Sequence, residues 1–362
     1  MKRQSIILAA AAAAALAGLT ACNKDITPEV APVQESVEEG TISFEVVPAR
    51  DIAVTKAVSA YTTAQTYESQ VNDVQILVFG SDGAINFYKD LGSSTSGSIN
   101  TTAGTKSVWA VVNGPDLSGI GTLSALQATA LDLSANSTTA SAGFVMAGSS
   151  TATVSSGSSA SCAITVSRLA ARVALTSVVN NLPSSYGAIT INRVFLSNVV
   201  GNQNIAGSAA VSTWYNKEGR ADESTRNTAH IIDGSTYKAS CESLTYRNVG
   251  NSVSNGSSLT PSTPYLFYSY ANSATTAPNG FSSSFAAQRS VLVVVATVSG
   301  TTYYYPVVLD DAVIARNTAY TVGLTITGLG SDDPNKPVSK GNLTASVTVS
   351  GWATGATYDE TI

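Results

Sequence analysis

The chain has 362 residues, of which 44% are hydrophobic and 12% are charged, and its formal net charge is -5 at pH 7. The charged share is about half that of an average soluble domain and Lys and Arg form no cluster, which excludes a protein that binds nucleic-acid phosphates. The hydrophobic share can supply an ordered core, so the bulk of the chain is not disordered, and its length suits two domains of ordinary size.

The N-terminus has the pattern of a lipoprotein signal. Two basic residues precede an apolar run over residues 6–19, which is short for a membrane span but typical of a secretory signal. The run ends in "LTAC" (19–22), with a leucine three residues before the cysteine, as in a lipobox. We therefore predict a signal peptide over 1–21 and a mature chain that begins at Cys22 with lipid on its sulfur. The alternative is a plain signal peptide with an incidental cysteine.

The segment after the predicted lipid site looks like a tether followed by a strand. Residues 23–40 contain two prolines, an acidic run and few apolar residues, so they cannot bury enough surface to order themselves. Residues 41–47 then alternate, with Ile42, Phe44 and Val46 on one face and polar side chains on the other. This pattern predicts a half-buried strand.

Two basic residues follow this strand within a short distance. Pro48 ends the strand pattern, Arg50 comes next in a polar stretch, and Lys56 lies a few residues further on. Both are candidate sites for a trypsin-like protease. An ordinary first strand followed by an ordinary loop is the alternative that these residues leave open.

Beyond residue 56 the sequence has the pattern of β structure. Short β-branched or aromatic runs recur between Gly, Ser, Asn and Pro clusters, and the best helix candidate, residues 117–133, is interrupted by two glycines. We predict an all-β fold of two β-sandwich domains in tandem, with a boundary near residues 166–168. The predicted strands are Val74–Phe79, Val108–Val112, Ala163–Val166, Ile189–Val200, Val291–Val298, Thr302–Val308, Tyr320–Thr327 and Leu343–Val349.

The sequence contains no convincing active site. His230 is the only histidine, no G-x-S-x-G motif is present, and the loop 330–336 lacks the alternating oxygen spacing of a calcium loop. We therefore predict no enzyme activity, no metal and no cofactor. Cys162 and Cys241 either form a disulfide in the exported protein or stay as buried thiols.

The C-terminus carries an apolar stripe that needs a partner. Residues 343–349 alternate as a strong strand, and Gly351 then shifts the phase. A second stripe with a two-residue period follows, made of Trp352, Ala356, Tyr358 and Ile362. Such a stripe, together with a ladder of backbone hydrogen bonds, can hold a neighbouring subunit by strand addition.

Taken together, the chain resembles the FimA-like fimbrillins of Bacteroidota, the subunits of type V pili. The resemblance rests on the order and spacing of several loose motifs along the chain. These motifs are "LTAC" (19–22), "VNDVQILVFGSDG" (71–83), "SVWAVVNGP" (107–115), "FVMAGSS" (144–150), "VSRLAARVAL" (166–175), "IARNTAYTVGLTITGLGSDDP" (314–334) and "GNLTASVTVSGW" (341–352).

The resemblance implies two transthyretin-like β-sandwich domains with Greek-key character and export as an outer-membrane lipoprotein lipidated at Cys22. A surface trypsin-like protease would then cut after Arg50, or after Lys56, and remove the strand of Ile42, Phe44 and Val46. The implied organisation is a tether with removable strand (22–50), an N-terminal sandwich (51–166) and a C-terminal sandwich (167–362) that ends in a donor segment (353–362).

Polymerisation follows from the same resemblance. A donor strand from another subunit, with Trp352, Ala356, Tyr358 and Ile362 facing inward, would fill the groove left by trimming. The implied partners are further copies of the subunit, anchor and tip subunits, the processing protease, the outer membrane before cleavage, and host or bacterial surface ligands on the finished fimbria. No nucleic-acid partner is expected.

Two alternatives use the same export route. A tip pilin of the same family would lack a usable C-terminal donor, and the tail here is short. A glycan-binding surface lipoprotein would need exposed aromatic side chains to stack on sugar rings, and "STWYN" (212–216) or the tyrosines at 303–305 could supply them. The competing interpretation of these aromatic residues is core and cross-strand packing.

Overall fold

The structure is a computed structural model that describes residues 39–49, 65–219, 241–280, 282, 285–309, 314–339 and 341–352. All of these residues belong to one compact unit, Glu38–Ile362. Cys22, Arg50, Lys56, His230 and the predicted donor segment 353–362 lie outside the described residues. Within the described ranges, no helix combines the length and the apolar character that crossing a membrane requires.

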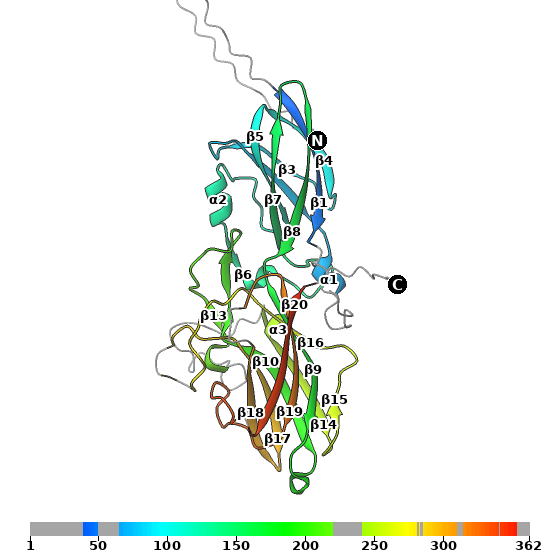
Figure 1. Ribbon diagram of the computed structural model, residues 1–362, viewed down its shortest axis with the longest axis vertical. Coiled ribbons are helices and arrows are strands. Elements are labelled where there is room, and N and C mark those ends of the chain that lie inside the picture. Colours follow the sequence, from blue (N-terminus) through cyan, green and yellow to red (C-terminus); the bar gives the residue numbers. More distant parts are fainter. Residues whose placement is uncertain are drawn as a thin grey trace, which may run out of the picture. The chain divides into compact units, whose positions relative to one another are not determined.

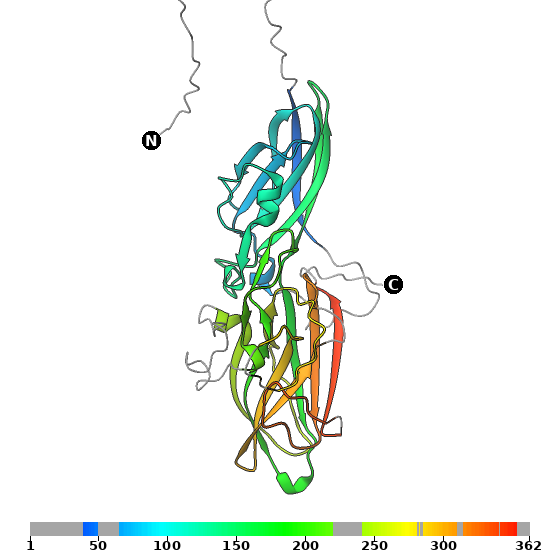
Figure 2. The same ribbon diagram turned by 90° about the vertical axis from the view of Figure 1, so that its left-hand side faces the viewer.

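The first part of the described chain forms a seven-stranded sheet (Figure 1). In spatial order its strands are β3 (Ile85–Asp90), β2 (Val74–Phe79), β5 (Gly104–Val112), β7 (Met146–Val154), β8 (Ser159–Arg168), β1 (Glu39–Pro48) and β4 (Ser96–Thr102). The first strand in the chain is therefore not an edge strand. It pairs antiparallel with β4 and parallel with β8, and Figure 2 shows β1 in dark blue running alongside β8 in green.

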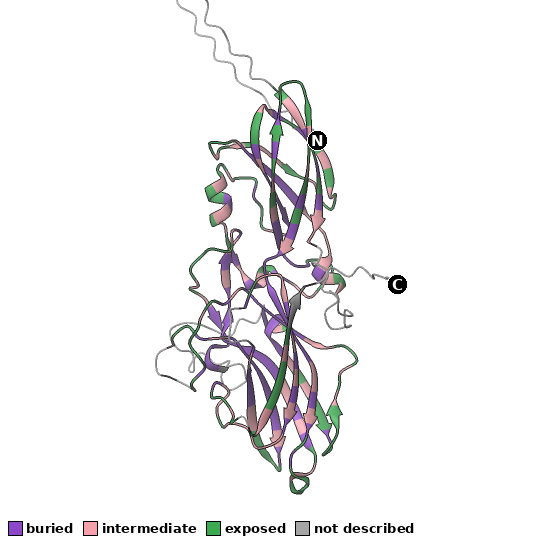
Figure 3. Cartoon of the chain, viewed as in Figure 1, coloured by how far each residue is buried: buried purple, intermediate pink, exposed green. Residues whose placement is uncertain are grey.

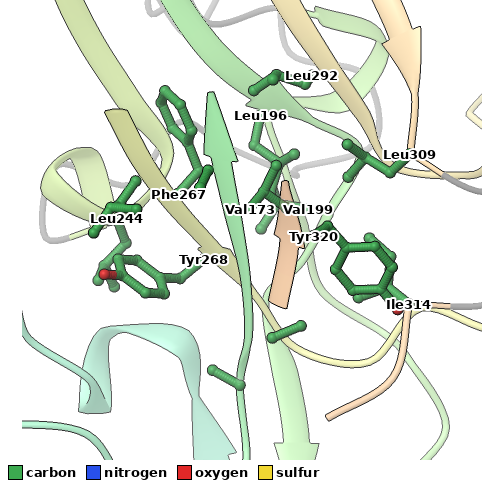
Figure 4. Packing of buried hydrophobic residues seen from close by; sticks show 14 of the residues in the cluster. Val173, Leu196, Val199, Leu244, Phe267, Tyr268, Leu292, Leu309, Ile314 and Tyr320 are labelled. Carbon is green, nitrogen blue, oxygen red and sulfur yellow. The ribbon is translucent and has the colours of Figure 1, made fainter. Parts of the chain in front are cut away.

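The second part of the described chain forms two further sheets. One has the order β14 (Tyr246–Val253), β10 (Ile189–Ser197), β17 (Val291–Val298) and β18 (Thr301–Val308). The other has the order β15 (Ser258–Leu259), β9 (Ala171–Asn180), β19 (Thr318–Ile326) and β20 (Leu343–Gly351), with β16 (Tyr265–Ser269) also paired to β9. Apolar side chains from both sheets share one core, in which Val173, Leu196 and Leu292 lie together (Figure 4).

Burial follows the strand pattern. Every residue of β2 and almost every residue of β17 is buried, whereas no residue of β3 is buried (Figure 3). The fully buried strands are the continuous apolar runs of the sequence, as expected for strands covered on both faces. The described part of the chain is thus nearly all β, as predicted. Every predicted strand overlaps an observed one, but the predicted strand Ile189–Val200 is divided at Asn198, which has a φ of 54°, into β10 and a two-residue strand, Val199–Val200, that belongs to another sheet. The division into two transthyretin-like domains stays a prediction.

The remaining elements are short. Two small sheets pair β11 (Val199–Val200) with β13 (Trp214–Tyr215), and β12 (Asn202–Asn204) with β6 (Ala130–Asp132). The helices are α1 (Thr66–Ser69), α2 (Leu123–Ala128) and α3 (Glu242–Thr245), and the 3-10 turns are Leu133–Ala135, Ser184–Tyr186 and Lys217–Gly219.

The predicted helix over 117–133 is only partly confirmed. The helical part is α2, which begins after Thr122, whose hydroxyl accepts a hydrogen bond from the backbone N–H of Ala125 at 3.2 Å. The two glycines lie before this cap, and the residues after α2 form β6 because they pair with β12. A side-chain cap and a strand partner, neither of which the apolar pattern reveals, set the two ends of this helix.

The two described cysteines are not joined. Cys162 lies half-buried in β8 as a free thiol, and burial raises the pKa of this thiol above its ordinary value. Cys241 is buried at the N-terminal cap of α3. Of the two states that the sequence left open, the structure has the thiols.

Candidate functional site

Strand β1 fills a groove between β4 and β8 with its apolar face. Ile42, Phe44 and Val46 are 0%, 4% and 3% exposed, and they belong to the hydrophobic core of the seven-stranded sheet. The alternation predicted for residues 41–47 is present, because the side chains of Ser43 and Glu45 between them are exposed. The strand is therefore an integral part of the core although it is the first described element of the chain.

Strand β1 pairs with each of its two neighbouring strands in one continuous register. Across β4, Ile42 pairs with Ile99 and Phe44 with Gly97. Across β8, Phe44 pairs with Cys162 and Val46 with Ile164. Both ladders continue without a bulge, so that β1 satisfies the backbone groups on the inner edges of both of its neighbours.

Removal of β1 would be costly to the isolated subunit. Full burial of an Ile, Phe or Val side chain is worth roughly 1.5–3 kcal/mol, so the three inward side chains together contribute roughly 5–9 kcal/mol. This sum is comparable with the total stability of an average domain, about 5–15 kcal/mol. An emptied groove would also leave two unpaired strand edges, which readily accept another strand.

A buried polar cluster lies beside the C-terminal end of this groove. Ala49, directly after β1, donates its backbone N–H to the carbonyl of Val166 on β8 at 2.6 Å. Two residues further along β8 is Arg168, which is 1% exposed. Its guanidinium donates from Nε to the backbone carbonyl of Glu68 at 2.7 Å and from Nη1 to the carbonyl of Trp352 at 3.0 Å.

Glu68 is the centre of this cluster, which we call the Glu68 cluster and which comprises Glu68, Arg168, Arg172, Tyr268 and Trp352. The carboxylate of Glu68 accepts hydrogen bonds from Arg172 Nη1 at 2.9 Å, Trp352 Nε1 at 3.0 Å and the Tyr268 hydroxyl at 2.5 Å. The Glu68 and Arg172 side chains are both completely buried. Burial, followed by the charge of Glu68, raises the pKa of Tyr268 well above its ordinary value.

The cluster joins segments that are far apart in the sequence. Glu68 belongs to α1, which follows the undescribed residues 50–64, while Trp352 is the last described residue before the tail. Arg168 and Arg172 lie 4.7 and 5.4 Å from the centroid of the Trp352 ring, within cation–π distance. The point where the chain resumes after the predicted cleavage region and the point where the tail starts are therefore held at the same cluster.

The structure corrects the role predicted for Trp352. The sequence pattern placed Trp352 on the face of a donor strand for a neighbouring subunit, but it is 0% exposed in its own chain. Its ring stacks on Tyr268 and meets Phe144 edge-on, at centroid distances of 5.7 and 5.6 Å. A two-residue period reveals which side chains face inward but not whose core they enter. The other predicted donor residues are Ala356, Tyr358 and Ile362, which lie outside the described residues.

The aromatic side chains considered for sugar binding are buried or packed against a core. Trp214 and Tyr215 are 6% and 4% exposed, and Tyr305 is fully buried. Tyr215 donates its hydroxyl hydrogen to Asp132 Oδ2 at 2.6 Å. Tyr303 is half-buried and packs against the core. These rings are therefore core and cross-strand residues in the described structure.

The loop 330–336 is a hydrogen-bonded turn. Ser331 Oγ accepts from the backbone N–H of Asp333 at 3.0 Å, and Asp333 Oδ1 accepts from that of Asn335 at 2.7 Å. The Asn335 side chain is completely buried, and its amide donates to Gln288 Oε1 at 2.7 Å. Among the residues that the structure describes, no three His, Cys, Asp or Glu side chains gather closely enough to hold a metal ion.

Sequence reasoning missed Glu68. It lies in a four-residue helix within a polar stretch that has no periodic pattern. The sequence signal for this cluster lies in the partners of Glu68, because "RLAAR" places Arg168 and Arg172 inside an otherwise apolar run. Arginines are almost never fully buried unless they are paired, so this run predicts a buried carboxylate elsewhere without indicating which one.

Comparison with known proteins supports the resemblance found in the sequence. Residues 41–189 match the model of the family described as major fimbrial subunit protein (FimA). This range begins within β1 and includes β2, β3, β4, β5, β7 and β8 of the seven-stranded sheet. The predicted resemblance to FimA-like fimbrillins is thereby confirmed. No curated protein matches the chain.

Solved structures of proteins from Bacteroides and Porphyromonas have a similar fold. A candidate cell adhesion protein of Bacteroides eggerthii is 21% identical with a TM-score of 0.64, covering 88% of this chain and 97% of that chain. A fimbrilin (FimA) of Porphyromonas gingivalis is 15% identical with a TM-score of 0.60, covering 88% and 99%. The tip fimbrial protein Mfa3 of Porphyromonas gingivalis, with a C-terminal truncation, is 12% identical with a TM-score of 0.50, covering 87% and 99%. At these identities the likeness is one of fold.

Proposed function

We propose that the chain is a structural pilin, a shaft subunit of a cell-surface fimbria. It is exported as an outer-membrane lipoprotein anchored through Cys22, trimmed by a trypsin-like protease after Arg50 or Lys56, and polymerised by donor-strand exchange. The protein has no catalytic role in this proposal. Its partners are further pilin subunits, and the finished fimbria meets ligands on host or bacterial surfaces.

The observation that carries the proposal is the position of β1. Its inward face of Ile42, Phe44 and Val46 is buried, and it lies between two strands instead of at the edge of the sheet. Loss of such a strand would leave a groove with an apolar floor and two unpaired edges, and a strand of the same alternation would satisfy both. Both proposed cleavage sites, Arg50 and Lys56, lie between β1 and α1.

The tail is the proposed occupant of that groove in the next subunit. Trp352 is bound in its own core, so the donor segment begins at Ala353 and ends at Ile362. These ten residues match β1 in length. Insertion of the tail of one subunit into the groove of the next is a head-to-tail contact that does not close on itself, and it therefore builds a filament.

Limited trypsin digestion of the full mature chain tests the trimming step. We expect a stable product that begins at Asp51 or Ala57, followed by a ladder of oligomers that survives detergent. The double variant Arg50→Gln, Lys56→Gln should keep β1 and stay monomeric, whereas Lys24→Gln in the tether should behave like the wild type. First cuts within the described body, for example after Arg193, would contradict the proposal.

Deletion of residues 353–362 tests the donor. The truncated subunit should fold and be trimmed like the wild type, because Trp352 and the Glu68 cluster are retained. It should form no ladder after trimming. If it still polymerises, the tail is not the donor, and if the intact protein polymerises in no trimmed form, a tip pilin is favoured. A glycan-binding lipoprotein has lost its main support, because Trp214, Tyr215 and Tyr305 are buried.

A further inference from the structure

The groove filled by β1 has a place shaped for an aromatic ring. The Phe44 side chain lies over Gly97 of β4, so that a Cβ atom added at Gly97 would be 3.0 Å from Phe44 Cζ and 3.5 Å from Cε2. Gly97 is not among the residues with a positive φ, so its backbone does not require glycine. The missing side chain instead makes room for the ring, an arrangement in which an aromatic residue covers a glycine on the neighbouring strand.

A second glycine closes the other end of the groove to side chains. A Cβ atom at Gly40 would lie 2.4 Å from Val154 Cγ1 and 2.8 Å from the backbone carbonyl oxygens of Ser155 and Ser158. Backbone oxygens cannot move aside as the tip of a long side chain can. Any strand in the place of β1 therefore needs a glycine here or must enter the groove beyond this point.

We propose that Gly97 is a specificity-determining residue of the groove and that Tyr358 of an incoming tail places its ring there. This inference rests on the proposed function and assigns the register of the inserted tail in the groove. Tyr358 is the only aromatic residue after Trp352, and it lies on the apolar stripe of the tail. With its ring over Gly97, Tyr358 takes the place of Phe44, and every second tail residue follows the inward positions of β1.

The direction of the incoming strand follows from the position of Gly40. If the tail runs as β1 does, Ala356 takes the place of Ile42, Glu360 that of Val46 and Ile362 that of the half-buried Pro48. In the opposite direction, Ile362 would fall on the Gly40 position, where a side chain does not fit. The charge of Glu360 does not distinguish the two directions, because Ile42 and Val46 are 0% and 3% exposed. The tail therefore runs parallel to β8, which keeps Ile362 in the inserted part.

The same register restricts how much of the tail can enter. Thr354 would fall on the Gly40 position, where a side chain does not fit, so the inserted part is Gly355–Ile362. The tyrosine hydroxyl needs water or a partner when the ring is buried. The ring atom of Phe44 nearest Gly97 is Cζ, which carries the hydroxyl in a tyrosine, so the Tyr358 hydroxyl would lie on the β4 side of the groove.

The rate of polymer formation after trimming tests this assignment in the full mature chain. Tyr358→Phe keeps the ring and should polymerise within about twofold of the wild type, whereas Tyr358→Leu should be at least roughly tenfold slower. Gly97→Ala should slow assembly by a similar factor, because its methyl group occupies the ring position. The double variant Gly97→Ala, Tyr358→Leu should be faster than Gly97→Ala alone, since the smaller side chain no longer meets the added methyl group.

The controls separate this assignment from folding and from the proposed function. Gly119→Ala adds a methyl group where no atom lies within 4 Å and should leave the rate unchanged. If Gly97→Ala weakens the precursor itself, the Tyr358 series still decides, because tail substitutions leave the core of their own subunit intact. Equal rates for Tyr358→Leu and the wild type would overturn the placement of the Tyr358 ring over Gly97 but would leave the proposed donor-strand exchange intact. A wild type that never polymerises would overturn both.

Discussion

Phe44→Ala should affect the protein before trimming and not after it. In the untrimmed chain Phe44 is 4% exposed and covers Gly97, and truncation of a buried phenylalanine to alanine typically costs about 3–5 kcal/mol. That loss is a large fraction of the stability of an average domain. After trimming, Phe44 has left the molecule, so the same substitution should have no effect on the trimmed subunit.

Urea unfolding of both forms, followed by the fluorescence of the three tryptophans Trp109, Trp214 and Trp352, which both forms retain, measures the difference. The trimmed form should lack residues 353–362 so that it stays monomeric. Phe79→Ala in β2 is the matched control, because Phe79 is also fully buried but remains after trimming, and it should lower the midpoint of both forms. A Phe44→Ala trimmed subunit that is destabilised as strongly as its precursor would refute the reasoning, since β1 would then still be in place.

Three further outcomes are expected. Glu68→Gln breaks a completely buried ion pair and should lower the free energy of unfolding by roughly 3–5 kcal/mol in urea titrations, whereas the exposed Glu45→Gln should change it little. Burial raises the pKa of Tyr305 to about 12 from its ordinary value near 10. The folded state therefore keeps a proton that the unfolded state loses, so this contribution is complete below about pH 10 and disappears between about pH 10 and 12; a urea midpoint that stays constant over that range would contradict it. Cys22→Ala should abolish metabolic labelling with a fatty acid, and equal label on the variant would rule out the lipid site.

The strands could be predicted from the sequence wherever a continuous apolar run stands between turn residues. Val74–Phe79 and Val291–Val298 have the predicted bounds, because both faces of these strands are buried and the run ends where burial ends. The pair of β6 with β12 was not predicted, and the residues of β11 were predicted only as the end of the strand Ile189–Val200, without their partner β13. Strands of two or three residues depend on a distant partner and leave no periodic pattern of their own.

Only part of the candidate site could be predicted from the sequence. The inward face of β1 follows from local alternation, and its burial is confirmed. The place of β1 between β4 and β8 does not follow from local alternation, because the order in which strands pair is decided by contacts across the sheet. Trp352 was assigned to the wrong subunit for the same reason, and Glu68 gave no signal because a single buried carboxylate is recognised only by the arginines and the indole that surround it.

The order of the strands has a consequence for how the subunit would leave the membrane in the proposed function. Four other strands of the seven-stranded sheet, β2, β5, β7 and β8, also have a neighbour on each side, but the chain continues through described strands before and after each of them, so two breaks would be needed to release any of these. Strand β1 has no described strand before it, so hydrolysis of one peptide bond between Ala49 and α1 breaks its covalent connection to the described strands that follow. The lipid predicted on Cys22 lies on the same side of that bond. In the proposed function, one hydrolysis would therefore both detach the subunit from its anchor and allow it to accept a neighbour, so that a subunit still fixed to the membrane by its own lipid would have no open groove.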